Sequence, residues 1–289
     1  MSDHFAPKNN LIIVAYDFTK EAECSLQHAN NLAKASKSSI DLVHIITKDT
    51  KESNEVRIKL NQLAEKNQTE TGNITTATAQ EGDIFSTIGQ IAEAKNAWYV
   101  SFGTHGVKGM QHILGAFALK VVSSSPCPVI VVQNKNIAEH GYKNILLPIE
   151  KSKSSKQKVY QAIALAKIYN CNIHLFADHE TDEQFLMNLK GNIGFVKNKL
   201  EEHGLALASE NYLDPKNKES FGKQSIKFAA ANAIDLILII ADDGAGLLGG
   251  IIGAEDIKII NNEAQIPVLC INPTNFQIFG SIISFGGFG

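Results

Sequence analysis

Residues 98–132 read WYVSFGTHGVKGMQHILGAFALKVVSSSPCPVIVV. An apolar run typical of a β-strand, Trp98 to Phe102, leads into a glycine turn at residues 103–106. Apolar residues at helical spacing follow, and Ser125 to Pro128 ends that pattern before a second apolar run, Val129 to Val132. The order of strand, glycine loop, helix and strand is that of a right-handed parallel crossover. This stretch therefore predicts an α/β fold with parallel strands.

The chain before this stretch alternates the same two patterns. Short apolar or threonine-rich runs are expected as strands at Leu11 to Tyr16, Ile40 to Ile46 and Ile74 to Ala79. Segments with helical periodicity separate them, the last at Ile84 to Ala94. The first half thus predicts the order β-α-β-α-β-α-β-α-β, which is a doubly wound α/β domain.

The second half repeats the first. Asn144 to Glu150 matches Leu11 to Asp17 at an offset of 133 residues (150 − 17), and Ala166-Lys167 matches Ala33-Lys34 at the same offset. Such a near-constant offset favours two tandem copies over one large domain with chance similarity. The predicted domains are residues 1–136 and 137–275, followed by an apolar tail, 276–289.

Composition narrows the class of protein. The chain has 289 residues, 44% of them hydrophobic and 20% charged, with a net charge of -3 and a pI of about 6.3. These values argue against a nucleic-acid-binding protein, which usually has a basic excess. No signal peptide and no membrane-spanning run is recognised. Four scattered cysteines without a C-x-x-C pair suit reduced thiols, so a cytoplasmic location is expected.

The chain resembles the universal stress protein family over nearly its whole length, as two tandem copies, of which the second is more divergent. The resemblance rests on Asp17 after the first strand, on Gly103-Thr104-His105-Gly106, and on the Ser-x-Cys-Pro-Val ending at Ser125 to Val129. Family members that bind ATP have Gly-x2-Gly, then nine residues, then Gly-Ser or Gly-Thr. Here Gly115-Ala116 stands close to that last pair, one residue short of the spacing, and it lacks the hydroxyl group. A Gly-x2-Gly turn alone is a weak motif.

The resemblance implies a five-stranded parallel sheet with helices on both faces in each copy, like the nucleotide α-hydrolases. It implies an ATP site, with Mg²⁺, at the carboxyl ends of the strands. It also implies pairing of the two copies through Val129–Val132 and Val268–Ile271, with a homodimer as a further assembly. The nucleotide-binding residues that it indicates are Ala15, Asp17, Ile45, Gly103, Thr104, His105, Gly106, Gly109, Gly115 and Ala116.

Several of these residues have simpler explanations. Asp17 is expected to contact the adenine end of ATP, but either Asp17 or Thr19 would also cap the next helix. Ile45 would lie under the adenine ring or simply belong to the core. Gly103 and Gly106 would either approach phosphates or form a tight turn without a ligand. His105 has no nucleophile nearby in the sequence, so a loop histidine is favoured over a general base.

The second copy departs from the family pattern. Glu150 replaces Asp17, and Asp178 falls at the position of Ile45. Asp242-Asp243 stands at the glycine turn, where two carboxylates would repel a triphosphate. We therefore expect no family-type ATP binding in this copy. The paired aspartates would hold a cation or, more simply, form a solvated turn.

The sequence thus predicts a stress-related regulatory protein that binds ATP mainly in its first domain. The alternative is a nucleotide-free tandem scaffold that acts through protein interfaces. An enzyme of the nucleotide α-hydrolase type is the third class, but the chain has no G-x4-G-K-[ST] motif and no clustered catalytic set. At most, slow ATP hydrolysis is expected.

Overall fold

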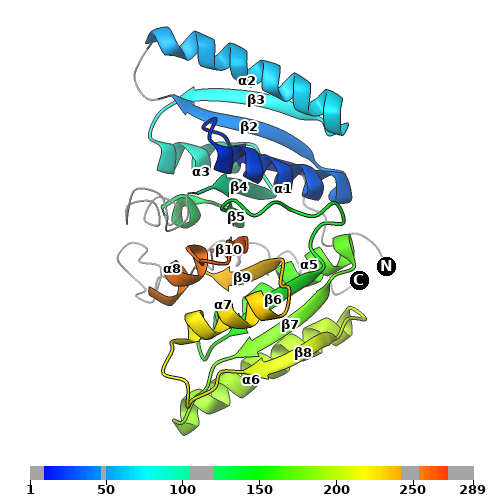
Figure 1. The fold of residues 1–289 in the computed structure, drawn as a ribbon, viewed down its shortest axis with the longest axis vertical. Coiled ribbons are helices and arrows are strands. Elements are labelled where there is room, and N and C mark those ends of the chain that lie inside the picture. The colour runs from blue at the N-terminus through cyan, green and yellow to red at the C-terminus, as the bar shows by residue number, and fades with distance from the viewer. Residues whose placement is uncertain (1–9, 47–49, 105–119, 242–253, 273–289) are drawn as a thin grey trace, which may run out of the picture. The chain divides into compact units, whose positions relative to one another are not determined.

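The computed structural model describes residues 10–46, 50–104, 120–241 and 254–272. The chain divides into two compact units, Met1–Gly141 and Tyr142–Gly289. Each unit contains a parallel sheet with helices packed on it (Figure 1). The fold class expected from the sequence, α/β with parallel strands, is confirmed.

The first unit alternates strands and helices. Its described elements are β1 (Leu11–Ala15), α1 (Lys20–Ser36), β2 (Ser39–Ile46), α2 (Thr50–Thr71), β3 (Thr75–Glu81), α3 (Ile84–Ala94), β4 (Tyr99–Gly103) and β5 (Val129–Val132). The strand order is β3-β2-β1-β4-β5, and the printed strand pairs in this unit are all parallel. The order reverses between β1 and β4, so α1 and α3 cover opposite faces of the sheet (Figure 1).

The core of this unit follows from its strand sequences. Ile12, Ile13 and Val14 in β1 are fully buried, because β1 is covered on both faces and lies between β2 and β4. Such strands are continuous apolar runs rather than alternating ones. This explains why the central strand was recognisable from its sequence, whereas the edge strand β3 is threonine-rich and partly exposed.

Helix α1 begins and ends at recognisable signals. Thr19 is the N-cap, and its Oγ1 accepts a hydrogen bond of 3.2 Å from the amide of Ala22. The acidic residues Glu21 and Glu23 lie in the first turn, where their negative charges interact favourably with the helix dipole. The helix ends at Lys37, which adopts the left-handed conformation with φ 56°.

One face of α1 holds the segment that follows β5. The side chains of Cys24 and His28 contact the Lys135 carbonyl at 3.3 and 2.8 Å. Asn31 donates to the carbonyls of Ala138 and Glu139 at 3.2 and 3.0 Å. Residues 137–141 therefore belong with the first unit, whereas the sequence had placed them in the second domain.

The second unit repeats this order. Its elements are β6 (Asn144–Ile149), η1 (Ser155–Lys158), α5 (Val159–Tyr169), β7 (Asn172–Ala177), α6 (Glu183–Glu202), β8 (Leu207–Tyr212), α7 (Phe221–Ala231), β9 (Leu236–Ile240), α8 (Ala254–Ile260) and β10 (Val268–Ile271). The strand order is β8-β7-β6-β9-β10, which corresponds strand by strand to that of the first unit. The repeat seen in the sequence is thus reproduced in the fold.

Further features bear on the expectations from the sequence. All four cysteines are buried and form no disulfide. Within the described ranges, no helix has the length and apolar character needed to cross a bilayer. The apolar tail, 276–289, lies outside the described residues.

An ion pair with a buried carboxylate and a partly exposed lysine connects the end of α3 to the strands. The Asp41 carboxylate, 1% exposed on β2, accepts from Lys95 Nζ at 2.6 Å. The hydroxyls of Thr76 and Thr78 on β3 also donate to it, at 2.9 and 3.0 Å. This desolvated carboxylate is therefore stable only while its donors remain in place.

We predict that Lys95→Met lowers the free energy of unfolding by about 3 kcal/mol, because it leaves Asp41 charged and buried. The exposed pair Lys66–Glu70, 3.8 Å apart on α2, provides the control, and Lys66→Met should cost about 0.5 kcal/mol or less. Urea denaturation followed by the fluorescence of Trp98, the sole tryptophan, reports on the first unit. Equal effects of the two variants would contradict the prediction.

Candidate functional site

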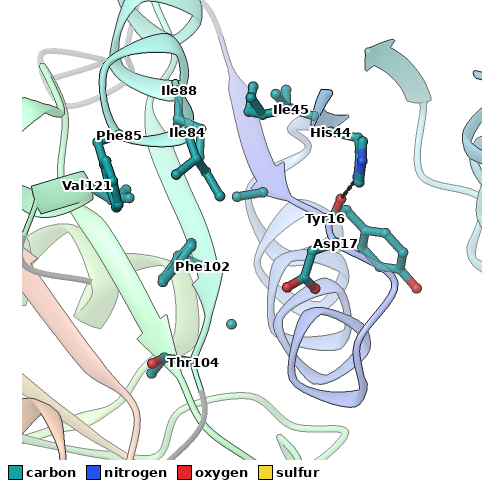
Figure 2. Close-up of a pocket in the computed structure, with 13 residues that line it drawn as sticks. Tyr16, Asp17, His44, Ile45, Ile84, Phe85, Ile88, Phe102, Thr104 and Val121 are labelled. Carbon is teal, nitrogen blue, oxygen red and sulfur yellow. Dashed lines mark hydrogen bonds between the residues drawn. The ribbon is translucent and has the colours of Figure 1, made fainter. Parts of the chain in front are cut away.

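A cavity of about 200 Å³ opens at the carboxyl ends of β1, β2 and β4 (Figure 2). It lies where the strand order reverses, which is the place where open parallel sheets bind ligands. Side chains from α3 and from the helical residues 120–124 complete it. Its lining comprises Ala15, Tyr16, Asp17, Val43, His44, Ile45, Ile84, Phe85, Ile88, Phe102, Gly103, Thr104 and Val121.

The cavity has a polar side and an apolar side. Figure 2 shows Asp17 and Thr104 along one side, and Ile45, Ile84 and Ile88 along the other. Ile45 lies near the end of β2 and is half-buried, whereas Ile88 on α3 is buried. An apolar wall with few polar groups is typical of small-molecule binding sites.

Asp17 lies in the turn between β1 and α1. Its Oδ1 accepts from the amide and the hydroxyl of Thr19, at 3.1 and 2.5 Å. Thr19 in turn caps α1, so the helix cap is Thr19 and Asp17 orients it. Asp17 Oδ2 has no hydrogen-bond partner among the described residues, and the side chain is exposed. One oxygen thus fixes the turn while the other is available to a donor.

An aromatic cluster holds this turn in place. Phe18 adopts φ 62°, a left-handed conformation that costs energy for a bulky residue. Its ring contacts those of Tyr16 and His44, with centroids 5.3 Å apart in both pairs. His44 Nδ1 lies 2.7 Å from the Tyr16 carbonyl, and the Tyr16 hydroxyl donates to Glu23 at 2.8 Å. Burial and the Glu23 carboxylate raise the pKa of Tyr16, so this hydroxyl stays a donor.

Gly103 lies at the closest approach between β4 and α1. A Cβ atom there would meet the carbonyl carbon of Glu21 at 2.4 Å and the amide of Ala22 at 2.6 Å, both backbone atoms. The next residue, Thr104, is 2% exposed, and its amide donates to the Val132 carbonyl at 2.8 Å. Thr104 Oγ1 is buried and has no partner among the described residues. Such a hydroxyl normally pairs with something, so it marks a place for a polar ligand group.

Five of the residues indicated by the family resemblance meet at this cavity. They are Ala15, Asp17, Ile45, Gly103 and Thr104. The other five, His105, Gly106, Gly109, Gly115 and Ala116, lie outside the described residues. Whether any of them binds a nucleotide stays a prediction. No group of three or more His, Cys, Asp or Glu side chains in the described ranges is arranged to hold a metal.

Sequence reasoning missed most of the apolar wall. The sequence predicts a helix over Ile84 to Ala94 and a strand ending at Phe102, but it assigns no residue of either element to a binding site. Helical periodicity identifies an inward face but does not tell a packed core from a cavity wall. The position of Ile84 directly after the Asp83 N-cap was the available signal, because the first turn of such a helix lies at the strand ends.

At the corresponding place in the second unit, the described residues line a cavity of about 30 Å³. Glu150 follows β6, as Asp17 follows β1, and lines this cavity. Asp178 follows β7, and its amide donates to the Ile149 carbonyl at 2.9 Å. Asp242 and Asp243, which the sequence analysis placed at the glycine turn, lie outside the described residues.

Residues 9–133 match the model of the Universal stress protein family. This match covers less than half of the chain and corresponds to the first unit, so it identifies one such domain and leaves the second unit unassigned. No curated protein matches the chain.

Solved structures match both units together. A universal stress protein from Archaeoglobus fulgidus DSM 4304 superposes with a TM-score of 0.75 and 15% identity, over 92% of this chain and 99% of that one. A functionally unknown protein from Pseudomonas aeruginosa PAO1 has a TM-score of 0.67 and 16% identity, over 98% of both chains. At these identities the matches show the fold alone. The universal stress protein from Archaeoglobus fulgidus in complex with dAMP gives a TM-score of only 0.36, with 16% identity, over 45% of this chain and 98% of that one.

We predict that Gly103→Ala lowers the free energy of unfolding by about 2 kcal/mol, because the new methyl group collides with the backbone of α1. Gly191 in α6 is the matched control, since a Cβ there meets nothing within 4 Å. Gly191→Ala should raise the free energy of unfolding by about 0.5 to 1 kcal/mol. Urea titration followed by circular dichroism measures both. A Gly103→Ala variant with an unchanged free energy of unfolding would contradict the close approach of β4 and α1.

Proposed function

We propose that the first unit binds an adenine nucleotide, ATP above all, and that the chain acts as a stress-related regulatory protein. The observation that carries this proposal is the cavity at the strand reversal, where the buried Thr104 hydroxyl and Asp17 Oδ2 have no hydrogen-bond partner among the described residues. The family match of residues 9–133 supports the stress-related role.

The cavity suits the base of a nucleotide. Its wall of Ile45, Ile84 and Ile88 would cover the faces of a flat ring, and Asp17 Oδ2 would accept from the adenine amino group. A volume of about 200 Å³ is below the usual 300–1,000 Å³ of a ligand site, so the described lining is sized for the base rather than for the whole nucleotide. Mg²⁺ would then be held mainly by the phosphates.

The nucleotide-free scaffold is the second candidate. It is favoured by Ala116, where ATP-binding relatives have a hydroxyl. It is also favoured by the two terminal strands, β5 and β10, each of which is apolar and pairs within its own unit with one strand only. Open apolar edges aggregate, so pairing of Val129–Val132 with Val268–Ile271 is part of this proposal, as is assembly into a homodimer.

Isothermal titration of ATP, GTP and adenosine tests the nucleotide proposal. One ATP site per chain is expected. GTP should bind at least about tenfold more weakly, because its C6 carbonyl would face the Asp17 carboxylate instead of an amino donor. Asp17→Asn should weaken ATP binding about tenfold and reduce the preference over GTP. Glu70→Gln, an exposed change on α2, should alter neither the affinity for ATP nor the preference over GTP.

Thr104→Val tests the buried hydroxyl separately. It keeps the shape of the side chain, so the fold should persist while ATP binds more weakly than to the unchanged chain.

If the unchanged chain gives no heat of binding at millimolar ATP, the nucleotide proposal is rejected and the scaffold proposal remains. Equal affinity for ATP and GTP would show that Asp17 does not read the base.

A further inference from the structure

A hydrogen-bonded row of polar side chains crosses three neighbouring strands of the second unit. Asn144 begins β6, His174 lies on β7, and Ser209 lies on β8, at the end of the strand order. Ser209 Oγ lies 2.9 Å from His174 Nδ1, and His174 Nε2 lies 3.3 Å from Asn144 Oδ1. The strand register pairs His174 with Leu146 and with Ser209, so the three polar side chains share one face of the sheet. All three are partly exposed, so a small molecule can reach them.

The neighbours of Asn144 determine which ring nitrogen of His174 carries the proton. Asn144 Nδ2 donates to the Ala233 carbonyl at 3.3 Å, and Asn144 Oδ1 accepts from Asn172 Nδ2 at 3.0 Å. The atom that faces His174 Nε2 is therefore an acceptor, so Nε2 carries the hydrogen. Nδ1 then has a free lone pair and accepts the hydrogen bond of the Ser209 hydroxyl. Burial lowers the pKa of His174, and both of its partners are neutral, so the ring is an uncharged base at neutral pH.

Asn211 adds a hydrogen-bond donor beside Ser209. It lies two residues further along β8, on the same face, and its Nδ2 donates to Ser209 Oγ at 2.8 Å. The second N–H of this amide has no partner among the described residues, so it is available to an oxygen that develops negative charge. A hydroxyl, a base, a group that orients the base and an oxyanion donor thus occur together, which is the arrangement that activates a nucleophile.

The first unit has an ion pair at the same place. Asp41 stands where the second unit has His174, at the offset of 133 residues (174 − 41). Its carboxylate accepts from hydroxyl groups of β3 and from Lys95 Nζ. A carboxylate neutralised by a lysine is a weak base, so the activated hydroxyl is particular to the second unit. The corresponding pairs at this offset are Asp41 and His174, Thr76 and Ser209, and Thr78 and Asn211.

We propose that Ser209 is a nucleophile for acyl transfer from esters of small carboxylic acids, with His174 as its base. Ser209 Oγ forms a bond to the acyl carbon, and its proton passes to His174 Nδ1. The alcohol leaves with that proton as its own bond to the acyl carbon breaks. Water then attacks the acyl group and gives a proton to Nδ1, and the acid departs as this proton returns to Ser209 Oγ. Asn144 positions the ring, and Asn211 donates to the oxyanion. This inference is independent of nucleotide binding by the first unit.

Labelling with an alkyl fluorophosphonate tests the nucleophile directly. This reagent forms a bond from phosphorus to an activated serine oxygen and releases fluoride. Mass spectrometry should find one label per chain, and peptide mapping should place it at Ser209. Ser209→Ala should remove the label and the release of p-nitrophenolate from p-nitrophenyl acetate. Ser220→Ala, which changes another partly exposed serine of this unit, should keep both, and Thr76 in the unchanged chain should stay unlabelled.

His174→Gln tests the base. Glutamine can still form a hydrogen bond to Ser209 but takes up no proton, so the labelling rate should fall at least about 100-fold. Circular dichroism checks that the variant keeps the fold. An unlabelled Ser209 in the unchanged chain, or an equal labelling rate in a folded His174→Gln variant, would overturn the proposal.

The pH dependence of labelling covers the case in which His174→Gln does not fold. In the unchanged chain the rate should rise as His174 loses its proton, with a midpoint below pH 6.5, because burial lowers the pKa of this ring. Asn144→Asp places a carboxylate beside the Nε2–H, which favours the protonated ring, so the midpoint should move upward by about one pH unit. A rate that does not titrate between about pH 4 and pH 8 would exclude His174 as the base.

Discussion

The reversal of strand order beside β1 is the constraint on which the first unit depends. The strands β2 and β3 lie on one side of β1, and β4 and β5 on the other, so the β1-α1-β2 and β3-α3-β4 crossovers run in opposite directions along the sheet. Because such crossovers are right-handed, α1 and α3 end up on opposite faces of the sheet. Their N-terminal turns then diverge above the strand ends, and the cavity lies between them. Asp17 and Ile84 line it because each stands at the beginning of one of these helices.

Close backbone packing fixes the position of α1 relative to the sheet. Gly103 brings the end of β4 against the first turn of α1, and Thr19, held by Asp17, fixes where that turn begins. The Tyr16–Phe18–His44 cluster then supports a strained backbone within the same turn. The residues beside the cavity are therefore positioned by contacts that also hold the helix and the sheet together.

Much of this fold could be predicted from the sequence, for physical reasons that differ between elements. The central strands are continuous apolar runs, since both faces are covered, and the periodicity of Ile84 to Ala94 predicted α3 at its observed bounds. The cavity wall was not predicted, because Ile88 has the same pattern whether it packs on a neighbour or borders a space. The burial of Lys158 was not predicted either, since a single lysine in a polar segment gives no sign of burial. The segment at 105–119, with half of the residues indicated by the resemblance, lies outside the described residues.

The two units differ at the corresponding strand ends. In the first, the strand ends border a cavity of about 200 Å³, beside which the Thr104 hydroxyl has no partner among the described residues. In the second, the described residues leave a cavity of about 30 Å³, bordered by the buried side chain of Lys158. Methyl NMR of isoleucine-labelled protein during an ATP titration tests this account most directly. Shifts at Ile45, Ile84 and Ile88, with Ile239, Ile240 and Ile259 unchanged, are the predicted result. Equal shifts in both groups, or none in the first, would contradict it.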